Sequence, residues 1–141
     1  MSGLEAWVLI VSTGAVLAAT LTPGAEAPRS LIDSCDTSRL GPAPLSAYLR
    51  FGTTSLNVLL FVPLGWAVTR IGRPRGRAVA VLLAVLLPIA IEVTQLLAAP
   101  LGRACQVPDV IDNLIGLGIG LALGLGVELA ATWSERRGAQ L

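Results

Sequence analysis

Residues 78–102 read AVAVLLAVLLPIAIEVTQLLAAPLG, and Glu92 is the only charged residue among them. A helix needs about 20 mostly apolar residues to cross ~30 Å of hydrocarbon, so this stretch is long enough to span a membrane. A backbone surrounded by lipid must satisfy its own hydrogen bonds, and the alternating pattern of a membrane barrel is absent. The stretch therefore predicts a transmembrane helix.

Three further stretches share this scarcity of charge. Residues 6–25 and 51–69 contain no charged side chain, and residues 113–134 contain only Glu128. We therefore predict an all-α membrane protein, a bundle of four transmembrane helices that forms a single domain over residues 1–141. The helices are expected near 5–22, 53–69, 78–99 and 110–133, with an outer loop over 23–52.

The composition excludes several other classes of protein. Hydrophobic residues make up 54% of the 141 residues and charged residues only 13%, and the mean hydropathy is +0.76. A soluble domain carries about 25% charged residues, and a disordered chain is poor in apolar ones. Ten basic residues against nine acidic ones leave a net charge of +1, too small an excess for nucleic-acid binding. With no His and two Cys, the chain lacks the usual zinc ligands and any Ser-His or Cys-His pair, so we predict no metal site and no cofactor.

The first apolar stretch has an alternative interpretation as a cleaved signal peptide. It is followed by Ala25-Glu26-Ala27, which matches the A-x-A pattern of a cleavage site. However, no Lys or Arg precedes the apolar run, Glu5 stands there instead, and Pro28 would follow the cut directly. We therefore expect the first helix to be retained.

The arginines predict the orientation of the helices. The loop between the second and third helices and the C-terminal tail hold Arg70, Arg73, Arg75, Arg77, Arg136 and Arg137, whereas the other two loops hold Arg29, Arg39, Arg50 and Arg103. The positive-inside rule then places both termini of this multi-pass membrane protein in the cytoplasm.

Both cysteines fall on the outer side in this orientation, Cys35 in the first outer loop and Cys105 in the second. Disulfides persist in the oxidising exterior, and two cysteines allow a single intramolecular pair. We predict a Cys35–Cys105 disulfide that ties the outer loops together, and two unpaired thiols are the alternative.

A small set of polar residues lies within or beside the outer ends of the predicted spans, where polar groups are costly unless they face a cavity, a partner or the bundle interior. Glu92 and Gln95 are three residues apart and share a helix face, as do Asp109 and Asp112. With a rise of about 1.5 Å per residue, the set forms one layer in the outer half of the membrane. The layer predicts an outward-facing site; alternatively, Glu92 pairs with Arg103 or Asn57 and only holds the bundle together. The full set is Asn57, Glu92, Gln95, Arg103, Asp109, Asp112 and Asn113.

Glycines recur at every fourth position of the last helix, at Gly116, Gly120 and Gly124. Small residues at this spacing allow two helices to approach closely. The partner is either another helix of the same chain or a second copy, so a homo-oligomer through this face is one of the two expectations.

The polar residues lie in motifs that resemble the VanZ-like family of membrane proteins. The family pattern has N-x-x-x-F-x-P-x-G in one helix, E-x-x-Q in the next, then an Arg, then D-x-x-x-N-x-x-G at the start of the last helix. In this chain the motifs begin at Asn57, Glu92, Arg103 and Asp109, in that order, within residues 53–126. Two positions depart from the family: Gln106 stands where an acid is frequent, and Asp112 stands where the family is usually apolar.

The resemblance implies a role in lowering sensitivity to glycopeptide antibiotics, especially those with lipid tails. Our leading hypothesis is an envelope protein without catalytic activity that engages an amphiphile at its outer polar layer. The expected partners are membrane lipids, a lipid-linked wall precursor or a lipoglycopeptide, and no nucleic acid. The alternatives are a membrane-embedded enzyme that uses Glu92 or Asp109 as acid or base on a lipid-linked substrate, and a small transporter.

Overall fold

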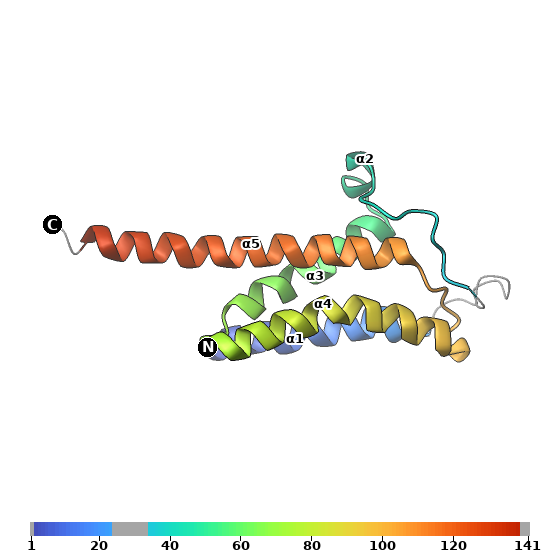
Figure 1. Cartoon of the computed structure of the whole chain (residues 1–141), viewed down its shortest axis with the longest axis horizontal. Helices are drawn as coiled ribbons and strands as arrows, with labels where there is room; N and C mark the ends of the chain where they lie inside the picture. The colour runs from blue at the N-terminus through green and yellow to red at the C-terminus, as the bar shows by residue number, and fades with distance from the viewer. Residues whose placement is uncertain (1, 24–33, 139–141) are drawn as a thin grey trace.

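The computed structural model describes residues 2–23 and 34–138 and is entirely helical in its regular elements. Four helices carry the apolar sequence, and Figure 1 shows that they alternate in direction along the bundle. Two short helical segments, α2 and the 3₁₀ helix η2, lie in the connections. The elements are α1 (Gly3–Leu21), α2 (Leu45–Tyr48), α3 (Thr53–Thr69), α4 (Pro74–Leu97), η2 (Ala99–Leu101) and α5 (Val107–Gly138).

Three of the helices, α1, α4 and α5, are long and apolar enough to cross a membrane, and α3 is a shorter apolar helix of 17 residues. The predicted helices agree with these elements, but α5 begins before 110 and ends after 133. It begins earlier because Pro108 is tolerated in a first helical turn, where the backbone N–H has no partner in any case. It ends later because a helix does not need apolar side chains beyond the lipid, so Arg136 and Arg137 still belong to it. The A-x-A pattern at 25–27, which offered the alternative of a cleaved signal peptide, lies outside the described residues.

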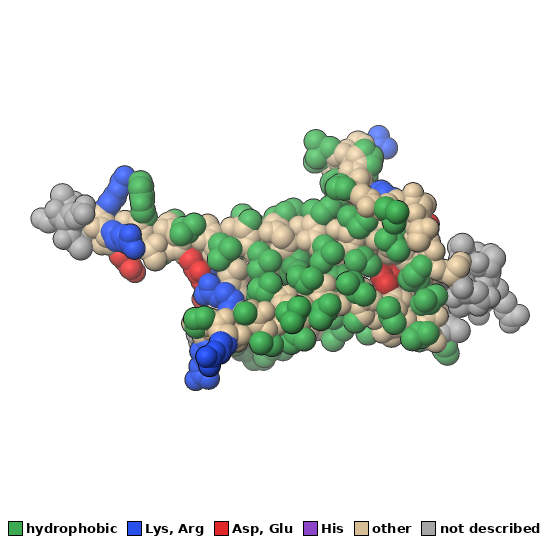
Figure 2. Space-filling model, in the orientation of Figure 1, with side chains coloured by type: hydrophobic (Ala, Val, Ile, Leu, Met, Phe, Trp, Pro, Cys, Tyr) green, Lys and Arg blue, Asp and Glu red, His purple; other side chains and the backbone are tan. Residues whose placement is uncertain are grey.

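The interior of the bundle is small. The buried core consists of Val16, Phe61, Leu64, Val68, Ala84, Ile91 and Leu117. Many large apolar side chains remain exposed on the outer faces of the helices, among them Trp7, Leu83 and Leu123. Figure 2 shows this apolar surface along the length of the bundle. Exposed apolar area of this extent fits contact with lipid rather than with water.

The tightest helix pair is α3 with α5, and glycines bring the two backbones together. A Cβ atom at Gly116 would overlap the carbonyl oxygen of Val58, and one at Gly120 would overlap that of Val62. A Cβ atom at Gly124 would overlap the side chain of Thr69. The glycine face is therefore packed against α3 of the same chain. A homo-oligomer stays a prediction, and it would have to use another surface.

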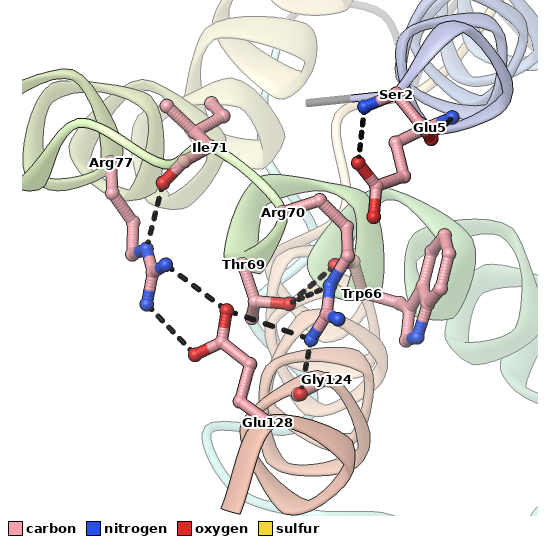
Figure 3. A network of polar contacts seen from close by, with 9 residues as sticks. All are labelled: Ser2, Glu5, Trp66, Thr69, Arg70, Ile71, Arg77, Gly124 and Glu128. Atoms are coloured by element: carbon pink, nitrogen blue, oxygen red, sulfur yellow. Dashed lines mark hydrogen bonds and ion pairs between the residues drawn. The ribbon is translucent and has the colours of Figure 1, made fainter. Parts of the chain in front are cut away.

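The start of α1, the α3–α4 loop and the far part of α5 lie toward one end of the bundle, which we call the arginine end (Figure 1). Figure 3 shows the polar network there. Arg77 donates two hydrogen bonds to Glu128, both of 3.0 Å, and Arg70 Nη2 lies 3.7 Å from the same carboxylate. Arg70 also donates to the carbonyl of Gly124 and lies over the ring of Trp66. Two arginines that the sequence suggested as topology signals thus also tie α3 and α4 to α5.

Replacing Gly120 by Ala tests the close packing of α3 on α5. We expect Gly120→Ala to lower the free energy of unfolding by about 1–3 kcal/mol, because the new methyl group forces the two backbones apart. Gly118→Ala is the matched control, since a Cβ at Gly118 meets no atom within 4 Å. Its methyl group leaves stability unchanged or raises it by up to about 1 kcal/mol through helix propensity. Thermal or detergent-induced unfolding of the purified protein measures both, and equal shifts in the two variants would contradict the packing.

Candidate functional site

The opposite end of the bundle, which we call the disulfide end, is organised by a covalent strap. Cys35 and Cys105 form a disulfide with a Cα–Cα distance of 4.6 Å, across a sequence separation of 70 residues. Next to it, Asp36 pairs with Gln106 in an isolated parallel bridge. The N–H of Asp36 donates to Cys105 O at 2.8 Å, and the N–H of Val107 donates to Asp36 O at 2.9 Å. The strap therefore fixes the segment that leads into α5.

Glu92 of α4 is held by that same segment. Its side chain is 5% exposed, and its Oε2 atom accepts a hydrogen bond of 2.6 Å from the backbone N–H of Gln106. Gln106 immediately precedes α5, where backbone N–H groups lack partners within the helix and favour a negative charge. The contact joins α4 to the start of α5 and leaves Oε1 of Glu92 without a hydrogen bond to any of the described residues.

Gln95 and Arg103 hold the end of α1. Gln95 Nε2 donates to the carbonyl of Thr20 at 2.9 Å, and Arg103 Nε donates to the carbonyl of Thr22 at 2.8 Å. The last carbonyls of a helix have no partner within it, so side-chain donors are needed to satisfy them. One function of this pair is thus to bring α1 against α4 and the α4–α5 loop.

These contacts surround a cavity of about 480 Å³ between α1, α3, α4 and α5. Its walls include six of the seven polar residues that the sequence singled out. It is large enough to hold a small molecule or a lipid headgroup, because ligand pockets range over about 300–1,000 Å³. The six polar residues are Asn57, Glu92, Gln95, Arg103, Asp109 and Asn113, and the other walls are Ala19, Thr20, Thr53, Leu56, Leu59 and Leu60.

Two amide groups in the walls have unsatisfied atoms. Asn57 Nδ2 and Asn113 Oδ1 are buried, and neither has a hydrogen-bond partner among the described residues. Asn113 is 1% exposed. Since about nine in ten buried polar groups in proteins are hydrogen-bonded, an unpaired buried donor and an unpaired buried acceptor in one cavity are unusual. A bound group that accepts a hydrogen bond from Asn57 and donates one to Asn113 would remove the free-energy cost of leaving these two buried atoms unpaired.

Asp109 adds a carboxylate to the cavity. It lies in the first turn of α5, and its backbone N–H donates to Gln106 O at 3.1 Å. In the described part of the chain its carboxylate takes part in no salt bridge. Nor do those residues contain a group of three His, Cys, Asp or Glu side chains that could hold a metal ion. The cavity thus carries two carboxylates, from Glu92 and Asp109, without a metal cluster.

Asp112, the seventh residue, does not line the cavity. It is 1% exposed and binds Arg39, with 2.6 Å between Arg39 Nη2 and Asp112 Oδ2. Tyr48 donates its hydroxyl to the other carboxylate oxygen at 3.1 Å. The hydrogen bond from Arg39 to the Asp112 carboxylate raises the pKa of the Arg39 guanidinium above its ordinary value. Asp112 directly precedes Asn113, so on a helix its side chain points about 100° away from that of Asn113.

Arg39 and Tyr48 were not expected from the sequence. They lie in the first loop, 73 and 64 residues away from Asp112 along the chain. The one available signal was Asp112 itself, a carboxylate at a position where an apolar residue was expected and which therefore needs a cation. Which arginine supplies the charge depends on how the loop returns to α5.

A comparison with protein families decides the relationship that the motifs suggested. The model of the VanZ/LLP1 family matches residues 8–128, well over half of the chain. The chain belongs to the VanZ/LLP1 family. The match contains all six cavity residues of this VanZ/LLP1-family protein and both cysteines of the strap. Comparisons with the curated proteins and with the solved structures find no match in either.

The Arg39–Asp112 pair gives a stability test that leaves the cavity untouched. Arg39→Gln leaves a buried carboxylate without its cation, so we expect the free energy of unfolding to fall by about 3 kcal/mol. Adding Asp112→Asn to the same protein removes the stranded charge and should recover most of the loss. Arg50→Gln, at an exposed arginine of the same loop, is the control. Unfolding of the purified protein measures all three, and a loss in Arg39→Gln no larger than in Arg50→Gln would refute the pairing.

Proposed function

We propose that this VanZ/LLP1-family protein is a four-span protein of a bacterial-type plasma membrane that engages the polar head of an amphiphile in the cavity at its disulfide end. In this proposal the cavity opens toward the outer leaflet, and occupation of the site lowers the sensitivity of the cell to teicoplanin-type glycopeptides. The observation that carries the proposal is a polar cavity of about 480 Å³ with two unsatisfied amide atoms in a bundle whose outer surface is apolar.

The four-span topology draws support from the direction of the helices. α3 extends about 25 Å at a rise of about 1.5 Å per residue, close to the ~30 Å of a bilayer core. It runs back from the disulfide end to the arginine end, so that α1, α3, α4 and α5 alternate (Figure 1). The basic loop between α3 and α4 and the arginines at the end of α5 are then on the same side, which the positive-inside rule makes cytoplasmic.

The walls of a second groove support an amphiphilic ligand. An apolar groove of about 450 Å³ is lined by α1, α3 and α4, three of the four helices that line the polar cavity, and lies farther from the disulfide end. Leu60 of α3 lines the polar cavity, and Leu64, one turn further along, lines the groove. A polar site followed by an apolar one along the same walls suits a molecule with a polar head and a hydrocarbon chain. The groove residues are Leu9, Thr13, Leu64, Val68, Ala80, Leu83, Ala84, Leu86, Leu87 and Ala90.

Restoring the protein to a bacterial host that lacks it tests the proposal in cells. We expect the restored host to tolerate more teicoplanin, with a smaller change for vancomycin, which lacks the lipid tail. Asn113→Ala removes the buried acceptor of the cavity and should return the teicoplanin sensitivity most of the way to that of the deleted host.

Thr132→Ala is the control for that variant. Thr132 lies in the exposed far part of α5, where its hydroxyl donates only to Leu129 O of the same helix. Immunoblots of the membrane fraction check that the variants accumulate equally. If the deleted and the restored hosts had the same sensitivity to both drugs, the proposed role would be abandoned.

The two carboxylates of the cavity favour one alternative, a membrane-embedded enzyme in which Glu92 or Asp109 transfers a proton. Glu92→Gln and Glu92→Ala distinguish it from binding. The amide oxygen of Gln can still accept the N–H of Gln106, so Glu92→Gln keeps the tie to α5 but cannot transfer a proton at this position. A binding role predicts that Glu92→Gln retains the change in teicoplanin sensitivity and Glu92→Ala loses it. Loss in both variants, with normal levels in the membrane, would favour the enzyme.

A further inference from the structure

We infer that the head of the amphiphile carries a primary ammonium group next to a phosphate, as in an aminoalkyl phosphodiester. This inference rests on the proposed function, because it specifies the chemistry of the ligand in the same cavity. It starts from the balance of donors and acceptors in the walls, and it concerns the headgroup alone.

The first half of this balance is the set of hydrogen-bond acceptors in the cavity walls. The carboxylate of Asp109 forms no salt bridge within the described residues. Asn113 adds an amide oxygen that is buried and unpaired. A ligand group that fits these atoms must be positively charged and must donate several hydrogen bonds. An ammonium group with three N–H donors meets both requirements.

The donors of the cavity call for an oxygen-rich group in the same ligand. Asn57 Nδ2 is a buried amide donor with no partner among the described residues. Arg103 uses Nε for the carbonyl of Thr22, which leaves its two terminal nitrogens for another acceptor. Guanidinium groups bind phosphate oxygens with charge-assisted hydrogen bonds. A phosphodiester thus complements Arg103, and an ammonium complements Asn113 and Asp109, whose carboxylate lies beside the amide of Asn57.

Two other cations fit these walls less well. A quaternary ammonium has the charge but no N–H group, so the oxygen of Asn113 would stay unpaired in a buried position. Calcium takes six to eight oxygen ligands, and the described residues hold no group of three acidic, His or Cys side chains placed for a metal. The need for donated hydrogen bonds therefore separates a primary ammonium from a cation that offers charge alone.

Lipid retention by the purified full-length protein tests the inference. The protein is reconstituted in bilayers of phosphatidylethanolamine, its mono-, di- and trimethylated forms and phosphatidylglycerol, all with the same acyl chains. Native mass spectrometry then counts the lipids that stay bound. We expect phosphatidylethanolamine to be retained about tenfold more than the trimethylated lipid or phosphatidylglycerol. Retention should fall stepwise as N–H groups are replaced by methyl groups, a readout that needs no variant.

Variants assign the preference to the cavity. Asp109→Asn should reduce the preference to less than about twofold, because the amide lacks the charge that strengthens the hydrogen bond. Glu135→Gln, at an exposed acid near the end of α5, should keep it. Addition of soluble O-phosphoethanolamine distinguishes the two sources of this chemistry. Competition at millimolar concentration means that the headgroup alone is recognised, and no competition means that the lipid chain is also required; both outcomes are compatible with an ammonium site.

The outcomes that overturn the inference differ from those that overturn the proposed function. Equal retention of all the lipids, with a loss of retention in Asn113→Ala, would rule out the ammonium but keep an amphiphile site. A preference for phosphatidylglycerol would likewise rule out the ammonium and keep an amphiphile site. Retention that is weak for every lipid and unaffected by Asn113→Ala would remove the site itself, and the proposed function with it.

Discussion

The packing of α5 on α3 through glycine is the constraint on which the rest of the structure depends. Gly116 and Gly120 leave no space for a side chain next to the carbonyls of Val58 and Val62. In a membrane, no hydrophobic effect drives two apolar helices together, so close van der Waals contact must do so. Asn57 precedes Val58, and Asn113 lies one turn before Gly116. The glycine contact thus places the two amides at the same end of the helix pair, where they line the cavity.

The disulfide strap supplies the second half of the site. The segment that precedes α5 is joined to α4 by the hydrogen bond from the backbone of Gln106 to Glu92. The disulfide and the Asp36–Gln106 bridge hold that segment, and the N–H of Gln106 then reaches Glu92. Glu92 therefore has a structural role as well as a place in the cavity. The sequence left open that Glu92 holds the bundle through Arg103 or Asn57; within the described residues its hydrogen bond runs to the backbone of Gln106 instead, so the partner expected for that role was wrong.

The helices were predictable because the lipid imposes a simple rule on sequence: about 20 apolar residues and little charge. The predicted limits of 53–69 agree with α3, and those of the other three helices differ by a few residues at their ends. The polar residues of the cavity were also predictable as a group, since a polar side chain in an apolar stretch needs a reason. The partner of Asp112 was not predictable, because Arg39 reaches it from a loop with no periodic pattern.

Composition and spacing were therefore sufficient to identify four apolar helices, the glycine face of the last one and the polar residues that lie toward the disulfide end. They could not tell which helix covers the glycines, because a repeat of small residues favours close approach without naming a partner. They could not separate Asp112 from Asn113 either, since adjacent residues on a helix point in different directions and only the position of α3 defines the inside. The cavity, its two unpaired amide atoms and the Arg39–Asp112 pair exist only once the helices are packed. They depend on contacts between residues far apart in the chain, which no local pattern specifies.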